Sequence, residues 1–346
     1  MRILEERGAI GGIREIGALM SLTEVLAKFH HHHATLPQKI ADSLQKLVAY
    51  THQIPLPAQG NTLKRWQILA QVAACDLSLA KLFESHLDAI AILHELGDST
   101  PKRGIWAVWA AEGSPRPLQY HADQINGLKT WCSGAKWVDH ALLSYRTPSG
   151  QSQLLCLDLD ASGIEHDMSV WQACGMQHTA TAHLSFKDTP VASFAPPDAY
   201  LNRVGFWHGA AGVAACWYGA AVALANYAQA ATRPPAHPYK SMYLGQIATA
   251  LSSAKGYFEQ VAQQIDAQPQ LAHELTIRML RAHVEHVVQQ VLQWTGQALG
   301  AAPYCQNAHF ARLAADLPVF IRQSHAAFDF GQIGELCLQQ EISWTL

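Results

Sequence analysis

The sequence predicts an α+β protein in which a compact antiparallel β domain separates two helical regions. Three observations predict this fold class. Apolar side chains recur at helical spacing in residues 1–104 and 197–346, they alternate with a period of two in residues 105–196, and turns containing Pro or Gly divide the segments. We therefore expect an N-terminal helical domain at 1–104, a middle β domain at 105–196 and a C-terminal four-helix bundle at 197–346.

The N-terminal domain is expected to hold helices within 16–52 and 62–96, separated by a stretch that contains Pro55 and Pro57. The first of these helical stretches includes four consecutive histidines at 30–33. Consecutive residues on a helix point around most of its circumference, so these imidazoles cannot all converge on one metal ion. We interpret the run as a solvated helix end and expect no metal site.

The β domain is divided by turn residues into short apolar runs. Its predicted strands are 106–109, 128–133, 141–145, 154–157 and 180–186. The dipeptide Asn126-Gly127 predicts a two-residue hairpin turn, because Asn-Gly readily adopts positive φ at both central positions. On the strand that follows, Trp131 and Ser133 share one face and offer an indole plane and a hydroxyl to a flat, heteroatom-rimmed ring.

The bundle is expected to contain four long helices joined by short breaks. They are predicted at 204–232, 240–266, 272–299 and 308–338. The first of them carries no formally charged residue and is long enough to raise the question of a membrane span. Its richness in Ala and Gly, and polar residues such as His208 and Asn226, favour a central helix of the bundle instead.

Composition restricts the partners and the compartment. Charged residues make up 15% of the chain and the net charge is −3 with histidines neutral, which predicts surface buried between subunits and no nucleic-acid partner. Seven cysteines without a CxxC spacing argue against a disulfide framework and a structural zinc site. The N-terminus shows no signal-peptide pattern, so we expect a cytoplasmic homo-oligomer.

Two motifs in the β domain carry a family resemblance. Residues 126–135 read N-G-L-K-T-W-C-S-G-A, and residues 175–191 begin with G-M-Q and end with the strand and turn A-H-L-S-F-K-D-T-P-V. Together with the order of the domains, they resemble the acyl-CoA dehydrogenase family of flavoproteins. That resemblance implies an antiparallel β-barrel as the middle domain, FAD as the cofactor, and a homodimer or homotetramer. It also implies oxidation of a CH–CH bond in a small acyl substrate such as a CoA thioester.

The same resemblance implies which residues hold the flavin. Trp131 would lie against the ring, Cys132 and Ser133 would belong to the same strand, and Ala110 and Ala111 would line the polar edge of the ring. Further along the chain, three residues correspond to positions that meet the dinucleotide in the family, in part on a neighbouring subunit: Arg233, Gln297 and Gly300. The arginine here opens R-P-P-A-H in place of the family's R-x-x-F-G.

The catalytic base of the family is missing from its usual place. Acyl thioester oxidation needs a carboxylate to remove the α-proton, and the family carries a Glu on its last bundle helix. The matching segment, 319–329, holds Ser324 and His325 instead, with Asp329 one helical turn after the histidine, so a His–Asp pair is the expected substitute. Two alternatives follow, a flavin monooxygenase on the same fold and a catalytically inactive or flavin-free oligomeric relative.

Overall fold

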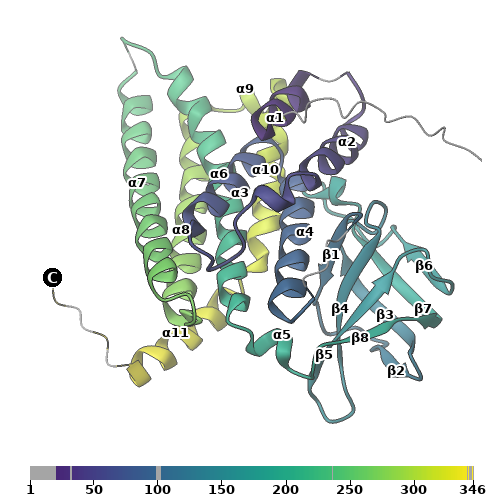
Figure 1. The fold of residues 1–346 in the computed structure, drawn as a ribbon. Coiled ribbons are helices and arrows are strands. Elements are labelled where there is room, and N and C mark those ends of the chain that lie inside the picture. Colours follow the sequence, from purple (N-terminus) through teal and green to yellow (C-terminus); the bar gives the residue numbers. More distant parts are fainter. Residues whose placement is uncertain are drawn as a thin grey trace, which may run out of the picture.

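A computed structural model of the chain describes residues 21–31, 33–98, 103–235, 237–340, 342 and 345. Long helices form one body and a smaller β domain packs against its side (Figure 1). The first part of the helix predicted from residue 16, and His32 of the histidine run, lie outside the described residues.

Within the residues that the structure describes, four helices and a short 3₁₀ turn precede the β domain. They are α1 (Leu22–His31), α2 (Leu36–Val48), η1 (Thr51–Gln53), α3 (Thr62–Cys75) and α4 (Leu77–Glu95). The Asp76 carboxylate begins α4 by accepting a hydrogen bond from the Leu79 N–H (3.0 Å), which satisfies one of the donors left free at a helix start. Nearly the whole of α4 is buried, because it lies between the bundle and the β domain (Figure 1).

The β domain contains two four-stranded sheets, ordered β1-β4-β5-β8 and β2-β3-β7-β6. The strands are β1 (Trp106–Trp109), β2 (Gln119–His121), β3 (Gln124–Cys132), β4 (His140–Arg146), β5 (Ser152–Asp158), β6 (Ile164–Asp167), β7 (Ala182–Pro190) and β8 (Ala192–Phe194). One pairing differs from the expected antiparallel barrel, because β1 pairs with β4 in parallel. The other pairs are antiparallel.

The hairpin turn predicted at Asn126-Gly127 is wrong. The turn between β2 and β3 is formed by Ala122 and Asp123, which both have positive φ (49° and 58°), as a two-residue hairpin requires. Asn126 and Gly127 lie inside β3 at an irregularity in its pairing with β7. Gly127 is needed there because a Cβ would lie 2.7 Å from the Pro117 carbonyl oxygen, so the dipeptide marks a bulge and a close backbone approach.

The C-terminal part of the chain forms the bundle. Its elements are α5 (Ala199–Asn202), α6 (Gly205–Ala231), α7 (Pro238–Ala267), α8 (Glu274–Leu299), α9 (Ala302–Gln306), α10 (Ala308–Phe320), η3 (Ile321–Gln323) and α11 (Ala327–Gln340). The single helix predicted over 308–338 is therefore wrong, because the chain leaves helical geometry at Ser324. A new helix starts there because the Ser324 hydroxyl and the Asp329 carboxylate accept hydrogen bonds from the N–H groups of Ala326 and His325.

The helices from both ends of the chain share one hydrophobic core, with α6 at its centre. By length and composition α6 is the one helix among the described residues that is apolar enough to cross a membrane, but 78% of the apolar window is buried inside the molecule. Small residues let its neighbours approach: a Cβ at Gly219 would lie 2.1 Å from the Ala70 carbonyl oxygen of α3. This packing matches the expected central helix of a bundle.

Candidate functional site

A cavity of about 780 Å³ lies where the β domain meets the helical body. Its walls come from α4, from the ends of β1 and β3, from the segment 171–181, from the first turns of α6, and from α8 and residues 319–325. Four residues predicted from the sequence to hold the cofactor line it: Ala110, Ala111, Trp131 and Ser133. Because elements from all three regions of the chain converge here, we treat this cavity as the candidate site.

Trp131 lines the cavity because β3 ends irregularly. The pairing of β3 with β7 shifts between Lys129 and Cys132, and Trp131 adopts a positive φ of 61°. Its indole is 51% exposed, although Trp171 and His183 contact it edge to face with ring centroids 6.2 and 5.2 Å away. Trp131 and Ser133 do line one cavity, but a bulge brings them there, not simple alternation along a strand.

A chain of hydroxyls runs from Ser133 into the protein. The Thr179 hydroxyl donates to the Met176 carbonyl (2.8 Å), so it accepts from Thr181 (2.8 Å), and Thr181 in turn accepts from Ser133 (3.0 Å). With its proton committed in this way, the Ser133 oxygen keeps lone pairs for an N–H group in the cavity. A flat ring with N–H donors on its rim suits that acceptor.

The segment that carries this hydroxyl chain is fastened to α10. The Met176 N–H donates to the Asp316 carboxylate at 2.6 Å, and burial raises the pKa of Asp316 to about 7. Gly175 allows the contact, because a Cβ there would lie 2.2 Å from the Ala315 carbonyl oxygen. The G-M-Q motif thus positions one wall of the cavity against the bundle.

Cys132 was predicted to bind the cofactor, and the structure places its side chain elsewhere. The thiol is fully buried, lies 3.5 Å from the Lys129 carbonyl oxygen, and does not line the cavity. Burial raises its pKa to about 12, so the thiol stays protonated and unreactive.

Arg233, Gln297 and Gly300 do not reach this cavity either. They follow or end the long helices α6 and α8, and all three are exposed. The cavity contacts α6 as far as Val213, and the helix continues to Ala231, which at 1.5 Å per residue is about 27 Å further along. Within one chain the structure therefore separates these residues from Trp131 and Ser133.

The expected His325–Asp329 side-chain pair is not formed. The Asp329 carboxylate accepts from the His325 backbone N–H (2.9 Å) and from Arg278 Nη1 (3.0 Å), so it caps α11 and pairs with an arginine. His325 itself is exposed at the cavity wall. Ser324 is buried, with its hydroxyl 3.5 Å from Asp329 Oδ2 and 3.4 Å from the Ala326 N–H. These contacts give the segment a structural role in starting α11.

Two carboxylates that the sequence reasoning missed come from α4. Glu84 lies 3.4 Å from Lys81 Nζ, and burial raises the pKa of Glu84. Asp88 lies 3.3 Å from Arg203 Nη2, and Glu95 holds the same arginine at 2.9 Å. The signal was available, since Lys81, Glu84, Ser85 and Asp88 form a polar stripe at helical spacing on one side of α4.

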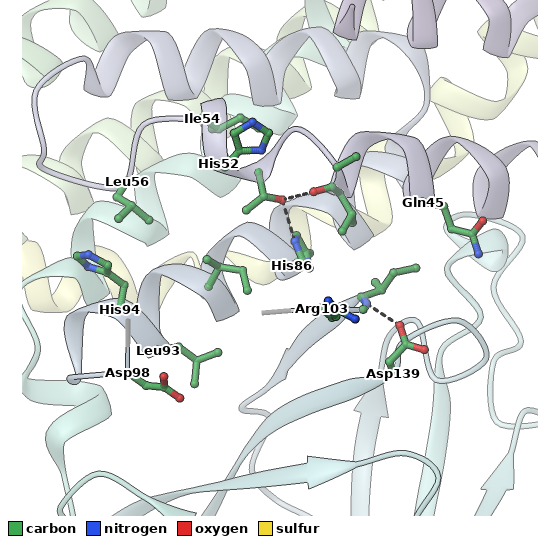
Figure 2. Close-up of a pocket in the computed structure, with 16 residues that line it drawn as sticks. Gln45, His52, Ile54, Leu56, His86, Leu93, His94, Asp98, Arg103 and Asp139 are labelled. Carbon is green, nitrogen blue, oxygen red and sulfur yellow. Dashed lines mark hydrogen bonds between the residues drawn. The ribbon is translucent and has the colours of Figure 1, made fainter. Parts of the chain in front are cut away.

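A second cavity, of about 790 Å³, lies between α2, α4 and the start of β1 (Figure 2). His86 faces it and joins three elements: its Nδ1 accepts from the Trp106 N–H (3.0 Å), and its Nε2 lies 2.9 Å from the Thr51 hydroxyl. Since that hydroxyl donates to the Val48 carbonyl, His86 Nε2 carries the proton. Burial lowers the pKa of His86 to about 4, so this imidazole is a neutral structural link.

The first cavity fits a flavin by the chemistry of its groups. Trp131 supplies an exposed aromatic face, Ser133 supplies an acceptor, and Ala110 and Ala111 leave the backbone beyond β1 open to a ring edge. Gly209 and Ala210 on α6 leave room opposite. No cluster of three or more His, Cys, Asp or Glu side chains suited to a metal occurs within the described ranges.

Comparison with known proteins identifies the fold of the chain. Residues 199–321 match the family model described as the acyl-CoA dehydrogenase C-terminal domain, whereas no curated protein matches the chain. Among solved structures, FMN-bound TdsC from Paenibacillus sp. A11-2 is 17% identical, with a TM-score of 0.75 over 92% of this chain and 96% of that one. Butyryl-CoA dehydrogenase from Megasphaera elsdenii is 15% identical, with a TM-score of 0.75 over 92% and 97%.

A third solved structure, the methanesulfinate monooxygenase MsuC from Pseudomonas fluorescens, is 14% identical, with a TM-score of 0.70 over 94% of this chain and 98% of that one. The fold is therefore shared by proteins named as dehydrogenases and as monooxygenases. The family model covers α5 to α10, the part of the bundle that closes the cavity. The chain thus has the fold of the acyl-CoA dehydrogenases, and its residues 199–321 resemble the C-terminal domain of that family.

Proposed function

We propose that this chain is a flavin-dependent monooxygenase that uses FMN in the cavity between the β domain and the bundle. The proposal rests on the ion pairing of the carboxylates that line the cavity. Among the described residues that line the cavity, Glu84 is paired with Lys81 and Asp88 with Arg203. The segment that corresponds to the family's base has Ser324 and His325 and no Glu. Dehydrogenation of a thioester needs an available carboxylate at the α-proton, whereas an oxygenase does not.

The residues of the chain have definable tasks in such an enzyme. Reduced flavin supplies the electrons with which oxygen is activated. Trp131 would hold one face of the ring, and the Ser133 oxygen, whose proton is directed to Thr181, would accept a hydrogen bond from a ring N–H. Phe206, Phe320 and Trp109 form apolar walls that exclude water and favour a flat, apolar substrate.

The preference for FMN over FAD rests on the position of the dinucleotide residues. Arg233, Gln297 and Gly300 lie at the far end of the bundle, so within one chain these three residues do not reach an adenylate group at the cavity. FMN has no adenylate to bind, and the solved neighbour TdsC is described with FMN. Binding of FAD with at least tenfold preference over FMN would show that a second subunit supplies these residues and would contradict this part of the proposal.

The experiment compares oxygen consumption with flavin reduction by substrate. We expect the protein, given FMN reduced by a separate reductase, to consume oxygen faster when indole is added and to form an oxygenated product detectable by mass spectrometry. Indole is a suitable first probe because it is flat and apolar. The proposal fails if a panel of flat aromatic compounds yields no oxygenated product while the flavin is bound and reduced.

Acyl thioester dehydrogenation, the activity implied by the sequence resemblance, is the second candidate. Glu84 favours it, because this buried carboxylate with a raised pKa faces the cavity from α4. Its test is anaerobic addition of butyryl-CoA to the FAD-loaded protein. Loss of the visible absorbance of the oxidised flavin, abolished by Glu84→Gln, would favour the dehydrogenase over the oxygenase.

A further inference from the structure

Arg281 differs from the other cationic side chains in and around the cavity. Three other cationic side chains among the described residues line the cavity, and each lies within 3.4 Å of a carboxylate. Lys81 pairs with Glu84, Arg203 with Glu95 and Asp88, and Arg322 with Glu285. Arg278, one turn before Arg281 on α8, pairs with Glu274 and Asp329. In the part of the chain that the structure describes, no carboxylate lies within 4.0 Å of the Arg281 guanidinium.

The lack of a paired carboxylate costs free energy because the Arg281 guanidinium is largely removed from water. Its guanidinium lies over the ring of Trp217, a fully buried side chain, with 4.9 Å between the guanidinium carbon and the ring centroid. Removal from water lowers the pKa of Arg281, since burial disfavours the charged form. Guanidinium groups nevertheless stay protonated in proteins, so a desolvated positive charge remains beside the cavity. A buried charge is expected to be paired.

Only part of the guanidinium is used by the protein. Nη1 donates to the Ala210 carbonyl of α6, and Nη2 donates to the Gln323 carbonyl at 3.2 Å. These two hydrogen bonds hold the guanidinium group between α6 and the turn that precedes α11. The other N–H groups of Arg281 have no hydrogen-bond partner among the described residues. A guanidinium group that is held in place and has unused N–H donors is suited to binding two oxygens of a carboxylate or phosphate.

We propose that Arg281 is the anion anchor of this cavity and that it binds an oxyanion carried either by an aromatic substrate, as a carboxylate, or by the flavin, as the phosphate of FMN. The aromatic side chains of Phe206, Phe320 and Trp109 line the same cavity and favour a flat, apolar group in the rest of the ligand. This inference deepens the proposed function and rests on it for the occupant of the cavity.

The test compares ligands that differ only in the anionic group, using binding as the readout. FMN is compared with riboflavin by fluorescence quenching, and indole-3-acetate with the neutral indole-3-ethanol by calorimetry. We expect the wild-type protein to prefer the anionic member of at least one pair by about tenfold or more, as for one charge-assisted bidentate contact. Arg281→Met should abolish that preference and leave the affinity for the neutral member unchanged.

The two arms distinguish the sources of the oxyanion. Loss of the FMN preference in Arg281→Met assigns the anchor to the flavin phosphate, and loss of the indole-3-acetate preference assigns it to the substrate. Arg322→Met is the matched control, because this arginine lines the same cavity but is neutralised by Glu285 at 2.8 Å. It should retain both preferences.

Two results would overturn the proposal. One is a wild-type protein that shows no preference for either anion, and this result needs no variant. The other is a folded Arg281→Met or Arg281→Lys protein that keeps the wild-type preferences. Arg281 would then have only a structural role, linking α8 to α6. If neither FMN nor riboflavin binds, the proposed function fails by itself, and the indole pair still tests the anchor.

Discussion

At the scale of single residues, a substitution of Trp131 should lower flavin affinity and leave the stability of the fold almost unchanged. Trp131 is 51% exposed and lines the cavity, so little apolar surface is lost from the core when its side chain is removed. We expect Trp131→Ala to change the free energy of unfolding by less than about 1 kcal/mol. Flavin affinity should fall by about tenfold or more, because the stacked ring loses its aromatic partner.

Fluorescence titration with FMN and urea unfolding would measure the two effects on the same samples. Leu338→Ala is the control, because Leu338 is 86% exposed on α11 and does not line the cavity. It should change neither quantity. Unaltered FMN affinity in Trp131→Ala would contradict the placement of the flavin ring.

His86 predicts a pH dependence of stability. Its pKa is about 4 in the folded protein and 6.5 when unperturbed, so between these values the unfolded chain binds a proton that the folded chain does not. The contribution of the neutral imidazole is complete above pH 6.5 and is lost as the pH falls toward 4. The loss amounts to about 3 kcal/mol, from a shift of some 2.5 pKa units at 1.36 kcal/mol each.

The variant His86→Gln isolates this effect from other titrations, such as that of Asp316, whose raised pKa acts in the opposite direction. A glutamine can accept from the Trp106 N–H and donate to Thr51, but it does not titrate. Urea unfolding of both proteins at several pH values should show wild type losing stability relative to the variant below pH 6.5. Parallel curves would contradict the buried neutral state of His86.

At the scale of elements, two glycines in long helices predict opposite results. Gly219 on α6 faces α3, where a Cβ would lie 2.1 Å from the Ala70 carbonyl oxygen, so Gly219→Ala must push the helices apart. We expect a loss of about 1–3 kcal/mol, as for other overpacked cores. Gly245 on α7 has nothing within 4 Å, so Gly245→Ala should gain about 0.5–1 kcal/mol through helix propensity. Thermal unfolding of both variants, with opposite shifts in Tm, is the measurement.

Elements with a strong hydrophobic period could be predicted from the sequence, and elements without one could not. The strand predicted at 106–109 is β1 with the same bounds, and the helix predicted at 272–299 is α8. The strands β2, β6 and β8 were missed because most of their residues are exposed, so no apolar alternation marks them. The break at Ser324 was missed although Ser324 and Asp329 are helix-start residues, because the apolar spacing continues across them.

At the scale of the whole molecule, the site was only half visible in the sequence. Trp131 and Ser133 could be placed on one cavity because a local motif carries them, and Ala110 and Ala111 because the family resemblance extends to the strand before it. Glu84, Asp88 and Arg281 were missed, since they reach the cavity through the packing of α4 and α8 against distant segments. Local spacing marks Glu84 and Asp88 as part of a polar stripe on α4, but it does not show which distant segments that stripe faces, and an ion pair between positions far apart becomes visible only in the fold.

The exposed apolar surface predicts self-association. Phe328 and Phe330 on α11 are 62% and 61% exposed, and the whole chain carries only 15% charged residues. Burying these aromatic side chains in a second copy would remove more apolar area from water than isolated surface residues normally offer. We therefore expect the 37.9 kDa chain to sediment as a homodimer or homotetramer at micromolar concentration.

A double variant tests whether α11 forms that interface. Replacing Phe328 and Phe330 with serine removes the apolar anchors without touching the core, because α11 buries none of its residues in the described chain. The variant should sediment as a monomer with an unchanged circular dichroism spectrum, since interface aromatics contribute most of the binding energy. Substituting Met242 on α7, which is also exposed, gives the matched comparison. If only the Met242 variant dissociates, the subunits meet through α7, and a wild-type monomer would refute self-association itself.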